Sequence, residues 1–473
     1  MKALAESGHK VTVISHFPLI KPIPNYKDIY LGSKEVLVDA FDMNMIQSSR
    51  FWKINTVFLL SYVANFSCEN GLASEAVQNF VKTKDRYDLM ITEFFNSDCF
   101  LGLAHRVKAP IIGLSSSTLM SWTSERLANP VHTAYIPNNL MDYSDRMTFL
   151  ERLENTVVTL YHQYYYKYFV LSKDNALISK HLGRKAARVN EFIANTSLML
   201  VNTHFSLNLP RPLVPSVIEV GGIHIRNLRP LSKNIEKWIN ESPEGVIYFA
   251  LGSLIKGDTF PKEKRDVFLR AFSRLPQRVL WKWESETMEG KPDNVMIQKW
   301  MPQLDILCHP NVKAFISHGG LLGTIEAVHC GVPVVVMPQF GDQHTNARAL
   351  EASGGGVILQ LREATEDKVY KALKKVLSAD SRQKAKDLSE RFRDRPMPPL
   401  ETAIYWVEYV ARHKGAPYMR TAAVNMPFYK YYLIDVAAFL IFIVSIFIYI
   451  LYKAVKYAIR IICKTKETKV KSS

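Results

Sequence analysis

Cysteine is scarce in this chain of 473 residues, which contains five: Cys68, Cys99, Cys308, Cys330 and Cys463. No two of them form a Cys-x-x-Cys pair, and none stands at a His/Cys spacing typical of a zinc site. We therefore expect buried thiols rather than a disulfide framework, and we expect no bound metal ion.

Acidic residues are also in short supply. Lys and Arg number 60 against 44 Asp and Glu, which gives a formal net charge of +16. Residues 453–473 hold seven Lys or Arg and a single Glu, and elsewhere the excess is diffuse. No motif of a DNA- or RNA-binding module accompanies this charge. We therefore expect no nucleic-acid partner.

Long apolar runs are absent until the end of the chain. The opening MKALAESGHK lacks the charged and then apolar pattern of a secretory leader, so no signal peptide is expected in these residues. Residues 431–452 are apolar with tyrosines at both ends, and Val436 to Leu451 carry no charge. A helix rising ~1.5 Å per residue over this length crosses a ~30 Å hydrocarbon layer. We predict a transmembrane helix over 431–452 and a basic cytoplasmic tail over 453–473.

Strand and helix patterns alternate through most of the chain, which predicts α/β structure with parallel, doubly wound sheets. The length exceeds that of one ordinary domain. Three prolines within residues 209–215, followed by Gly221-Gly222, indicate an extended linker. We predict an amino-terminal domain over 1–222 and a carboxyl-terminal domain over 223–428.

The most informative stretch runs from Trp300 to Asn346. Residues 312–316 are typical of a buried strand, and residues 321–329 of a helix that ends at Gly331. The turn Ser317-His318-Gly319-Gly320 lies between them, at the carboxyl end of the strand and the amino end of the helix. Free N–H groups and a positive dipole end at such a place suit a phosphate.

The polar groups around this turn resemble the signature of the UDP-glycosyltransferases, a membrane-bound family that glycosylates lipophilic small molecules. The resemblance rests on Trp300, Gln303, His309-Pro310, Ser317 to Gly320, Glu326, Gly331 to Pro333, Pro338 and Asp342-Gln343, and on the stretches 209–224 and 246–253. It implies two facing Rossmann-like domains of the GT-B type, followed by a carboxyl-terminal transmembrane helix.

The resemblance also assigns donor-binding roles in the later half of the chain. Trp300 would stack on uracil, Gln303 would touch the nucleoside, and Glu326 would accept from the ribose hydroxyls. The remaining donor-binding positions that it implies are His318, Gly319 and Gly320 at the pyrophosphate, Asp342 and Gln343 at the sugar, Arg211 across the cleft from the phosphates, and Gly252, Ser253 and Gly323 nearby.

Catalysis in that family uses a histidine base on a loop after the first strand. The chain matches the family from its second element onward, so we expect the base histidine to be absent. His16 follows a strand, but it matches a later family position that is not catalytic. An acid near the loop after residues 86–93 would orient the base, and Asp98 and Glu93 are alternative candidates for it.

The resemblance implies transfer of a hexose, preferably glucose, from a UDP-sugar to a hydroxyl of a small lipophilic acceptor with inversion, in detoxification or in hormone or pigment conjugation. No cofactor is expected beyond the co-substrate UDP-glucose or another UDP-hexose. The Tyr-rich run 161–169 either lines the acceptor pocket or belongs to the core. Two alternatives remain: a catalytically impaired UDP-sugar-binding membrane protein that partners full-length enzymes, or an incomplete form of an active enzyme.

Location follows from the predicted anchor and from the chain end. The ending Lys469-Val-Lys471-Ser-Ser473 is similar to a dilysine signal of endoplasmic-reticulum membrane proteins. Asn-x-Ser sequons at Asn65, Asn195 and Asn240 permit a luminal position for the preceding domains. We expect a single-pass endoplasmic-reticulum protein with luminal catalytic domains, and either homo- or hetero-oligomers.

Overall fold

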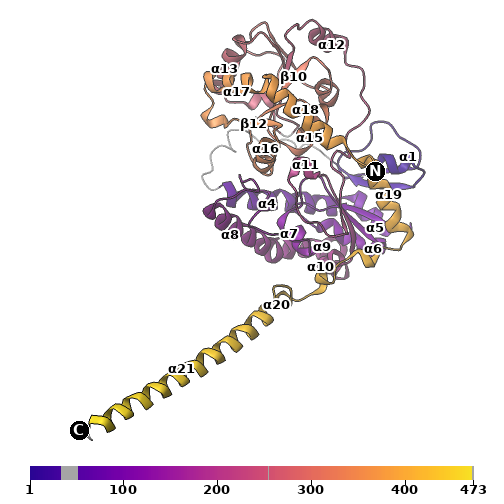
Figure 1. Ribbon diagram of the computed structural model, residues 1–473. Coiled ribbons are helices and arrows are strands. Elements are labelled where there is room, and N and C mark those ends of the chain that lie inside the picture. Colours follow the sequence, from indigo (N-terminus) through magenta and orange to yellow (C-terminus); the bar gives the residue numbers. More distant parts are fainter. Residues whose placement is uncertain (33–51, 254, 471–473) are drawn as a thin grey trace. The chain divides into compact units, whose positions relative to one another are not determined.

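The computed structural model describes residues 1–32, 52–253 and 255–470 (Figure 1). The chain divides into two compact units, Met1–Arg420 and Thr421–Ser473. The first unit contains every strand in the described part of the chain, and it is treated first.

The later half of the first unit is built on one six-stranded parallel sheet of order β12-β11-β10-β7-β8-β9. Its strands are β7 (Val246–Ala250), β8 (Arg278–Lys282), β9 (Val295–Gln298), β10 (Val312–Ser317), β11 (Val334–Val336) and β12 (Gly356–Ile358). The chain builds the sheet outward from β7 through β8 and β9, then returns to β10 on the other side of β7. The strand order therefore reverses between β7 and β10, and ligands of such sheets bind at that point.

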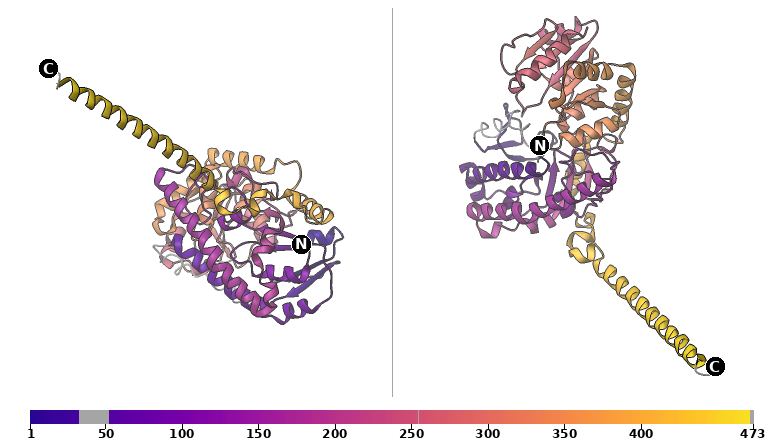
Figure 2. Two further views of the ribbon diagram at one scale, coloured as in Figure 1. Left: turned by 90° about the horizontal axis from the view of Figure 1, so that it is seen from below. Right: turned by 90° about the vertical axis from the view of Figure 1, so that its left-hand side faces the viewer.

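Helices cover both faces of this sheet, because its strands are apolar on both sides. One face packs against α13 (Lys262–Ser273) and α17 (Glu366–Val376) through Phe268 and Leu373. The other face packs against α12 (Lys233–Asn240), α14 (Gln303–Leu307), α15 (Leu321–Cys330), α16 (Gln343–Ala352) and α18 (Ala379–Arg393). Two further views show these layers from other sides (Figure 2).

The earlier half of the unit contains two separate parallel sheets. One pairs β1 (Val11–Ser15) with β2 (Tyr26–Tyr30), and the other has the order β3-β4-β5-β6. The strands of the second are β3 (Met90–Glu93), β4 (Ile111–Ser115), β5 (Thr196–Val201) and β6 (Val217–Glu219). The main helices here are α1 (Lys2–Glu6), α4 (Trp52–Ala73), α5 (Glu75–Lys82), α7 (Ser121–Arg126), α8 (Phe149–Tyr165), α9 (Leu171–Leu182) and α10 (Val189–Ala194).

A late helix returns to the early sheet. α19 (Pro399–Arg412) packs Ala403, Val407 and Val410 against Ile112 and Leu198 of β4 and β5. The two halves are therefore connected twice, through the segment before α12 and through the segment that leads to α19. The predicted domain limits at residues 222 and 428 stay predictions.

The expectation of free thiols is wrong for four of the five cysteines. Disulfides join Cys68 to Cys99 and Cys308 to Cys330, across Cα–Cα distances of 6.1 and 4.7 Å. Both distances fall within the range that a disulfide spans. The sequence separations of 31 and 22 residues carry no pairing signal, because only the fold brings these cysteines together.

The second unit consists of η7 (Ala422–Asn425), α20 (Phe428–Tyr431) and the long helix α21 (Ile434–Val470) (Figure 1). The helical segment Ile434–Ile462 is long and apolar enough to cross a membrane. Its most apolar stretch has no buried residue in the structure. This candidate span begins three residues after the predicted start at 431. The helix continues through most of the predicted tail, whose residues 471–473, including Lys471 of the dilysine pattern, lie outside the described residues.

Candidate active site

Two strand ends meet at the point where the later sheet reverses its order. Ser317 at the end of β10 pairs with Ala250 at the end of β7. The loops that follow, Gly252-Ser253 and His318 to Gly320, therefore leave the sheet side by side. Both belong to the predicted donor-binding set, and both line the same cleft, Gly319 excepted.

His318 lies between two glycines. A Cβ placed on Gly252 would stand 2.7 Å from His318 Cε1, and a Cβ on Gly320 would stand 2.6 Å from His318 Nε2. Any side chain at either position would displace the ring, so the observed position of the imidazole requires glycine at both positions. Gly252 also has φ +79°, a conformation that favours glycine.

Burial lowers the pKa of His318 to about 4, so the ring is neutral at pH 7. Its Nδ1 is buried without a hydrogen-bond partner among the described residues. A neutral imidazole presents one donor and one acceptor nitrogen. The neutral ring can therefore donate one hydrogen bond to an anion in the cleft. It does not carry a positive charge before the anion binds.

Glu326 follows on α15, one and a half turns after the His-Gly-Gly turn. The Gln303 side-chain amide donates to Glu326 Oε2 at 2.6 Å. Gln303 lies over Gly323, where an added Cβ would stand 3.0 Å from Gln303 Nε2. Burial raises the pKa of the Glu326 carboxyl, and the Gln303 hydrogen bond opposes that rise. These three predicted residues thus form one contact group on the cleft wall.

The cleft has a volume of about 1040 Å³. Trp300 lines it with a side chain that is 71% exposed, as an aromatic surface for a ligand would be. The predicted donor-binding residues that line it are Gly252, Ser253, Trp300, Gln303, His318, Gly320, Gly323, Glu326, Asp342 and Gln343. The structure therefore brings ten of the twelve together.

Asp342 and Gln343 lie where α16 begins. Asn346 donates to Asp342 Oδ2 at 3.1 Å and, from the same amide, to the Gly319 carbonyl at 3.1 Å. Gln343 Oε1 accepts from the backbone N–H groups of Gln339 and Phe340. These bonds fix the loop around both side chains on the wall of the cleft. Gly319 itself packs against Val336 rather than lining the cleft.

Arg211 is not part of this cleft, which corrects its predicted place opposite the donor phosphates. It lines a separate small cavity, and its guanidinium donates to the Asn208 carbonyl at 3.1 Å. The linker that carries it is thus held against the early half of the unit. Cations that the sequence analysis missed occupy the cleft instead: Arg226, Arg229 and Lys282, together with His224. Arg226 forms an ion pair with Asp305. No local sequence pattern marks these four residues as part of the cleft, because the strand order and the path of the linker bring them there.

The opposite wall of the cleft comes from the early half and is largely apolar. It includes Leu60, Val63, Phe95, Met120 and Leu140. Contacts across the halves hold this wall near α16, because the Thr345 hydroxyl donates to the Met141 carbonyl at 2.7 Å and Arg348 pairs with Asp142. The apolar wall is suited to an apolar ligand.

The Tyr-rich run 161–169 does not line the cleft. Tyr166 is fully buried in the core of the early half, whereas Tyr164 and Tyr168 are exposed. The sequence left two interpretations open for this run, an acceptor pocket or the core. Tyr166 belongs to the core, whereas Tyr164 and Tyr168 belong to neither.

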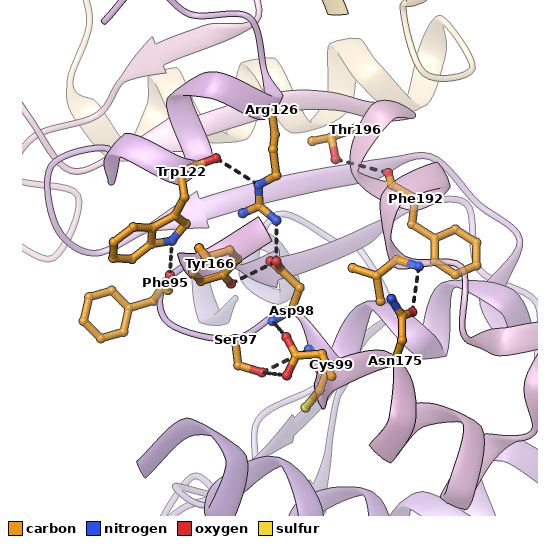
Figure 3. Close-up of polar contacts among 12 residues, drawn as sticks. Phe95, Ser97, Asp98, Cys99, Trp122, Arg126, Tyr166, Asn175, Phe192 and Thr196 are labelled. Atoms are coloured by element: carbon orange, nitrogen blue, oxygen red, sulfur yellow. Dashed lines mark hydrogen bonds and ion pairs between the residues drawn. The ribbon is translucent and has the colours of Figure 1, made fainter. Parts of the chain in front are cut away.

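Asp98 is buried within a polar cluster (Figure 3). Its Oδ2 accepts from the Arg126 guanidinium and, at 2.9 Å, from the Tyr166 hydroxyl. Its backbone N–H donates to Asp174 at 2.8 Å. Burial, followed by the charge of Asp98, raises the pKa of Asp174 to about 7. The Arg126 guanidinium thus pairs with the buried Asp98 side chain inside this cluster.

Glu93, the alternative acid, is exposed at the end of β3 and accepts from the Ser116 hydroxyl at 2.6 Å. Asp98, Glu93 and His16 all line a second cavity, which adjoins the cleft through Phe95 and Asn96. The structure therefore places both candidate acids near the cleft but not on its wall, and the choice between them stays open.

Among the described residues, no group of three His, Cys, Asp or Glu side chains is arranged to hold a metal ion. The expectation that the reaction needs none stays a prediction.

Comparison with known proteins bears on the whole chain. The sequence model of the family described as UDP-glucoronosyl and UDP-glucosyl transferase matches residues 7–469. Two proteins of Dactylopius coccus are similar: UDP-glycosyltransferase UGT5 is 44% identical over 97% of this chain and 88% of its own length, and UDP-glucosyltransferase 2 is 40% identical over 98% and 88%. Mouse UDP-glucuronosyltransferase 1A1 is 32% identical over 97% and 88%.

Solved structures resemble the fold. The glycotransferase of kitacinnamycin aligns with a TM-score of 0.55 and 17% identity, over 87% of this chain and 94% of its own. LpCGTa, solved in complex with UDP, aligns with a TM-score of 0.52 and 16% identity, over 86% and 94%. Both support the predicted GT-B arrangement of two Rossmann-like halves.

Proposed function

Because this chain belongs to the UDP-glucoronosyl and UDP-glucosyl transferase family and is a UDP-glycosyltransferase, we propose that it transfers glucose from UDP-glucose to a hydroxyl of a small lipophilic acceptor, with inversion. The name of one relative, UDP-glucosyltransferase 2, supports glucose as the sugar. The observation that carries the proposal is the meeting of Trp300, His318 and Glu326 around a single cleft.

In the proposed pose the donor runs along the later half. Uracil lies on Trp300, the ribose hydroxyls donate to Glu326, and the sugar reaches Asp342 and Gln343. The diphosphate lies over His318 and the amino end of the ten-residue helix α15, whose dipole favours an anion. A carboxylate is a good acceptor for a vicinal diol, and Gln303 keeps this one oriented.

The chemical step moves one proton and one glucosyl group. A base takes the proton of the acceptor hydroxyl, the oxygen attacks the anomeric carbon, and the bond to the diphosphate oxygen breaks so that UDP leaves with the electron pair. The leaving diphosphate gains negative charge, which the His318 N–H and the α15 amino end are placed to stabilise. The acid that orients the base is Asp98 or Glu93.

Location is part of the proposal. A candidate span at Ile434–Ile462 supports a membrane anchor. Two disulfides support an oxidising compartment such as the endoplasmic-reticulum lumen. Asn195 and Asn240 are exposed and suited to glycan attachment, whereas Asn65 lies half-buried within α4.

The second candidate is a UDP-sugar-binding protein that does not turn over by itself. The observation that favours it is the Asp98 cluster, in which Arg126 and Tyr166 rather than a histidine hold the carboxylate. Incubation of the full chain with labelled UDP-glucose and a simple phenol separates the two. Labelled glucoside supports the enzyme, and saturable donor binding without product supports the second candidate.

Trp300 provides the first quantitative test. We expect Trp300→Ala to weaken UDP binding about tenfold, since stacking on an aromatic ring contributes about 1–3 kcal/mol per base. Trp300→Phe should retain most of the affinity, because it keeps an aromatic face. Isothermal titration with UDP measures both. Equal affinity in the wild type and in Trp300→Ala would rule out the proposed seat of the base.

A further inference from the structure

The helix α14 carries Gln303 to the cleft, but it is too short to hold its own position. It has five residues, and isolated helices shorter than about 12–15 residues are marginal in water. Pro302 precedes it, and a proline side chain cannot cap the N–H groups of the first turn. The place of α14 on the cleft wall therefore depends on bonds to neighbouring elements. One of these is the ion pair between Asp305 and Arg226 of the linker.

A disulfide ties the end of α14 to the end of α15. Cys308 follows the last residue of α14, Cys330 is the last residue of α15, and their Cα atoms are 4.7 Å apart. Glu326 lies four residues before Cys330, so both side chains are on the same side of α15, one turn apart. Gln303 is the first residue of α14 and donates to Glu326 Oε2 at 2.6 Å. The two helices are thus joined twice, once by the disulfide and once by this hydrogen bond.

The covalent bond is the part of this arrangement that keeps the hydrogen bond in register. The Gln303 side chain has three rotatable bonds, and holding it in one position costs conformational entropy. At ~1.5 Å per residue, the disulfide lies about 7.5 Å along α14 from Gln303. A shift of α14 by ~1 Å along α15 would lengthen the 2.6 Å contact beyond the usual range of a hydrogen bond. The disulfide restricts that shift, because its bond lengths and angles leave little freedom between the two Cα atoms.

Constraint of the unfolded chain is the usual effect of a disulfide, and it applies to both disulfides of this protein. The two differ in what they join. Cys68 and Cys99 line the second cavity in the early half, whereas the Cys308–Cys330 bond joins the two helices of the nucleoside contact. A purely stabilising role predicts the same consequence for both disulfides. A positioning role predicts a loss of donor affinity for only one of them.

We propose that the Cys308–Cys330 disulfide is a positioning element of the nucleoside site, which holds α14 against α15 so that Gln303 keeps the Glu326 carboxylate directed at the ribose. This inference rests on the proposed donor pose, in which Glu326 accepts from the ribose hydroxyls. Neither cysteine is among the described residues that line the cleft, so the disulfide acts through its neighbours. Both cysteines are partly exposed, which makes the bond accessible to a reductant. Reduction by a dithiol, which is itself oxidised to a disulfide, gives two thiols and weakens donor binding.

The test removes the bond from the full chain in nanodiscs with a double variant, Cys308→Ala together with Cys330→Ala. Titration calorimetry should show UDP bound about three- to tenfold more weakly, within the range of coupling between neighbouring groups. The ratio of the affinities for UDP and 2′-deoxy-UDP should fall toward one, because the carboxylate is no longer held at the hydroxyl that the deoxy compound lacks. In a Glu326→Ala background, the double variant should cause no further loss. A dithiol added to the wild type should reproduce the effect of the double variant.

Two controls separate positioning from stability. Cys68→Ala together with Cys99→Ala removes the other disulfide, and Val376→Ala removes buried volume from α17 on the opposite face of the later sheet. Both should lower the melting temperature and leave the affinity ratio as it is in the wild type. Mass spectrometry of a tryptic digest without reductant should show the peptides 300–313 and 314–348 linked to each other.

Several results would overturn this proposal. Unlinked peptides 300–313 and 314–348 would show that the bond is not formed. An unchanged affinity ratio in the double variant, or an equal further loss in the Glu326→Ala background, would leave the disulfide with a stabilising role alone. A fallen ratio in Val376→Ala would assign the loss to general destabilisation. If Glu326→Ala itself keeps the wild-type ratio, the donor pose is wrong and this inference falls with it, an outcome distinct from a failure of the double variant alone.

Discussion

Replacement of His318 by alanine is expected to weaken binding of UDP-glucose about 10- to 100-fold and to lower any turnover by about 100-fold or more. The first figure is the loss of a hydrogen bond to a charged group, about 1.5–3 kcal/mol, and the second is the typical effect of removing one donor that stabilises developing charge. His318 is suited to this role because two glycines leave room for its ring and Nδ1 is without a described partner. His329→Ala, on α15 but outside the cleft, is the matched control.

The same histidine predicts a dependence on pH. Its pKa is about 4 in the free protein, and a bound diphosphate raises it because the anion favours the imidazolium. Binding therefore takes up a proton. The affinity should rise as the pH is lowered from the pKa of His318 in the complex to its pKa of about 4 in the free protein. UDP-glucose is the correct probe, since both of its phosphates are esterified and keep their charge. His318→Asn should retain part of the affinity but lose this slope. An unchanged slope in the variant would assign the proton to another group.

Replacement of Glu326 by alanine is the second large effect. We expect UDP to bind about 10- to 100-fold more weakly, because two charge-assisted hydrogen bonds to the ribose are lost. Gln303 also loses the carboxylate that orients it at 2.6 Å. The loss should be smaller for 2′-deoxy-UDP, which lacks one hydroxyl, than for UDP.

Glu326→Gln separates charge from shape in this prediction. It keeps the side-chain length and should recover part of the affinity, whereas Glu244→Gln at an exposed position should have no effect. Titration calorimetry with UDP and 2′-deoxy-UDP measures all four proteins. If Glu326→Ala binds the two nucleotides with the same loss of affinity, the carboxylate does not contact the ribose.

Much of the donor side could be predicted from the sequence because its signals are local. The strand β10, the turn after it and the helix stop at Gly331 fell within a residue of prediction, since glycine and β-branched runs act over short distances. The resemblance implied donor-binding roles for Gly252 and His318, and their neighbouring positions agree with the rule that ligands bind beyond the carboxyl ends of parallel strands.

Features that depend on which strands become neighbours could not be predicted. The disulfides join cysteines whose proximity exists only in the fold. Arg211 was placed by resemblance, but its bond to the Asn208 carbonyl holds it in another cavity. The second cavity, lined by β1 and β3, depends on strand order, and the pattern of either strand alone gives no sign of it. The burial of Tyr166 and the exposure of Tyr164 could not be predicted, because a run of similar residues shows no difference between the two sides of a helix.

The central claim is that UDP-sugar binds at the carboxyl ends of β7 and β10 with its base on Trp300. Photolabelling with 5-azido-UDP-glucose, followed by trypsin and mass spectrometry, tests it most directly, because the reactive group is on uracil. The account predicts label on the peptide 300–313, abolished by excess UDP. Label that UDP displaces from peptides of the early half, with none on 300–313, would contradict it.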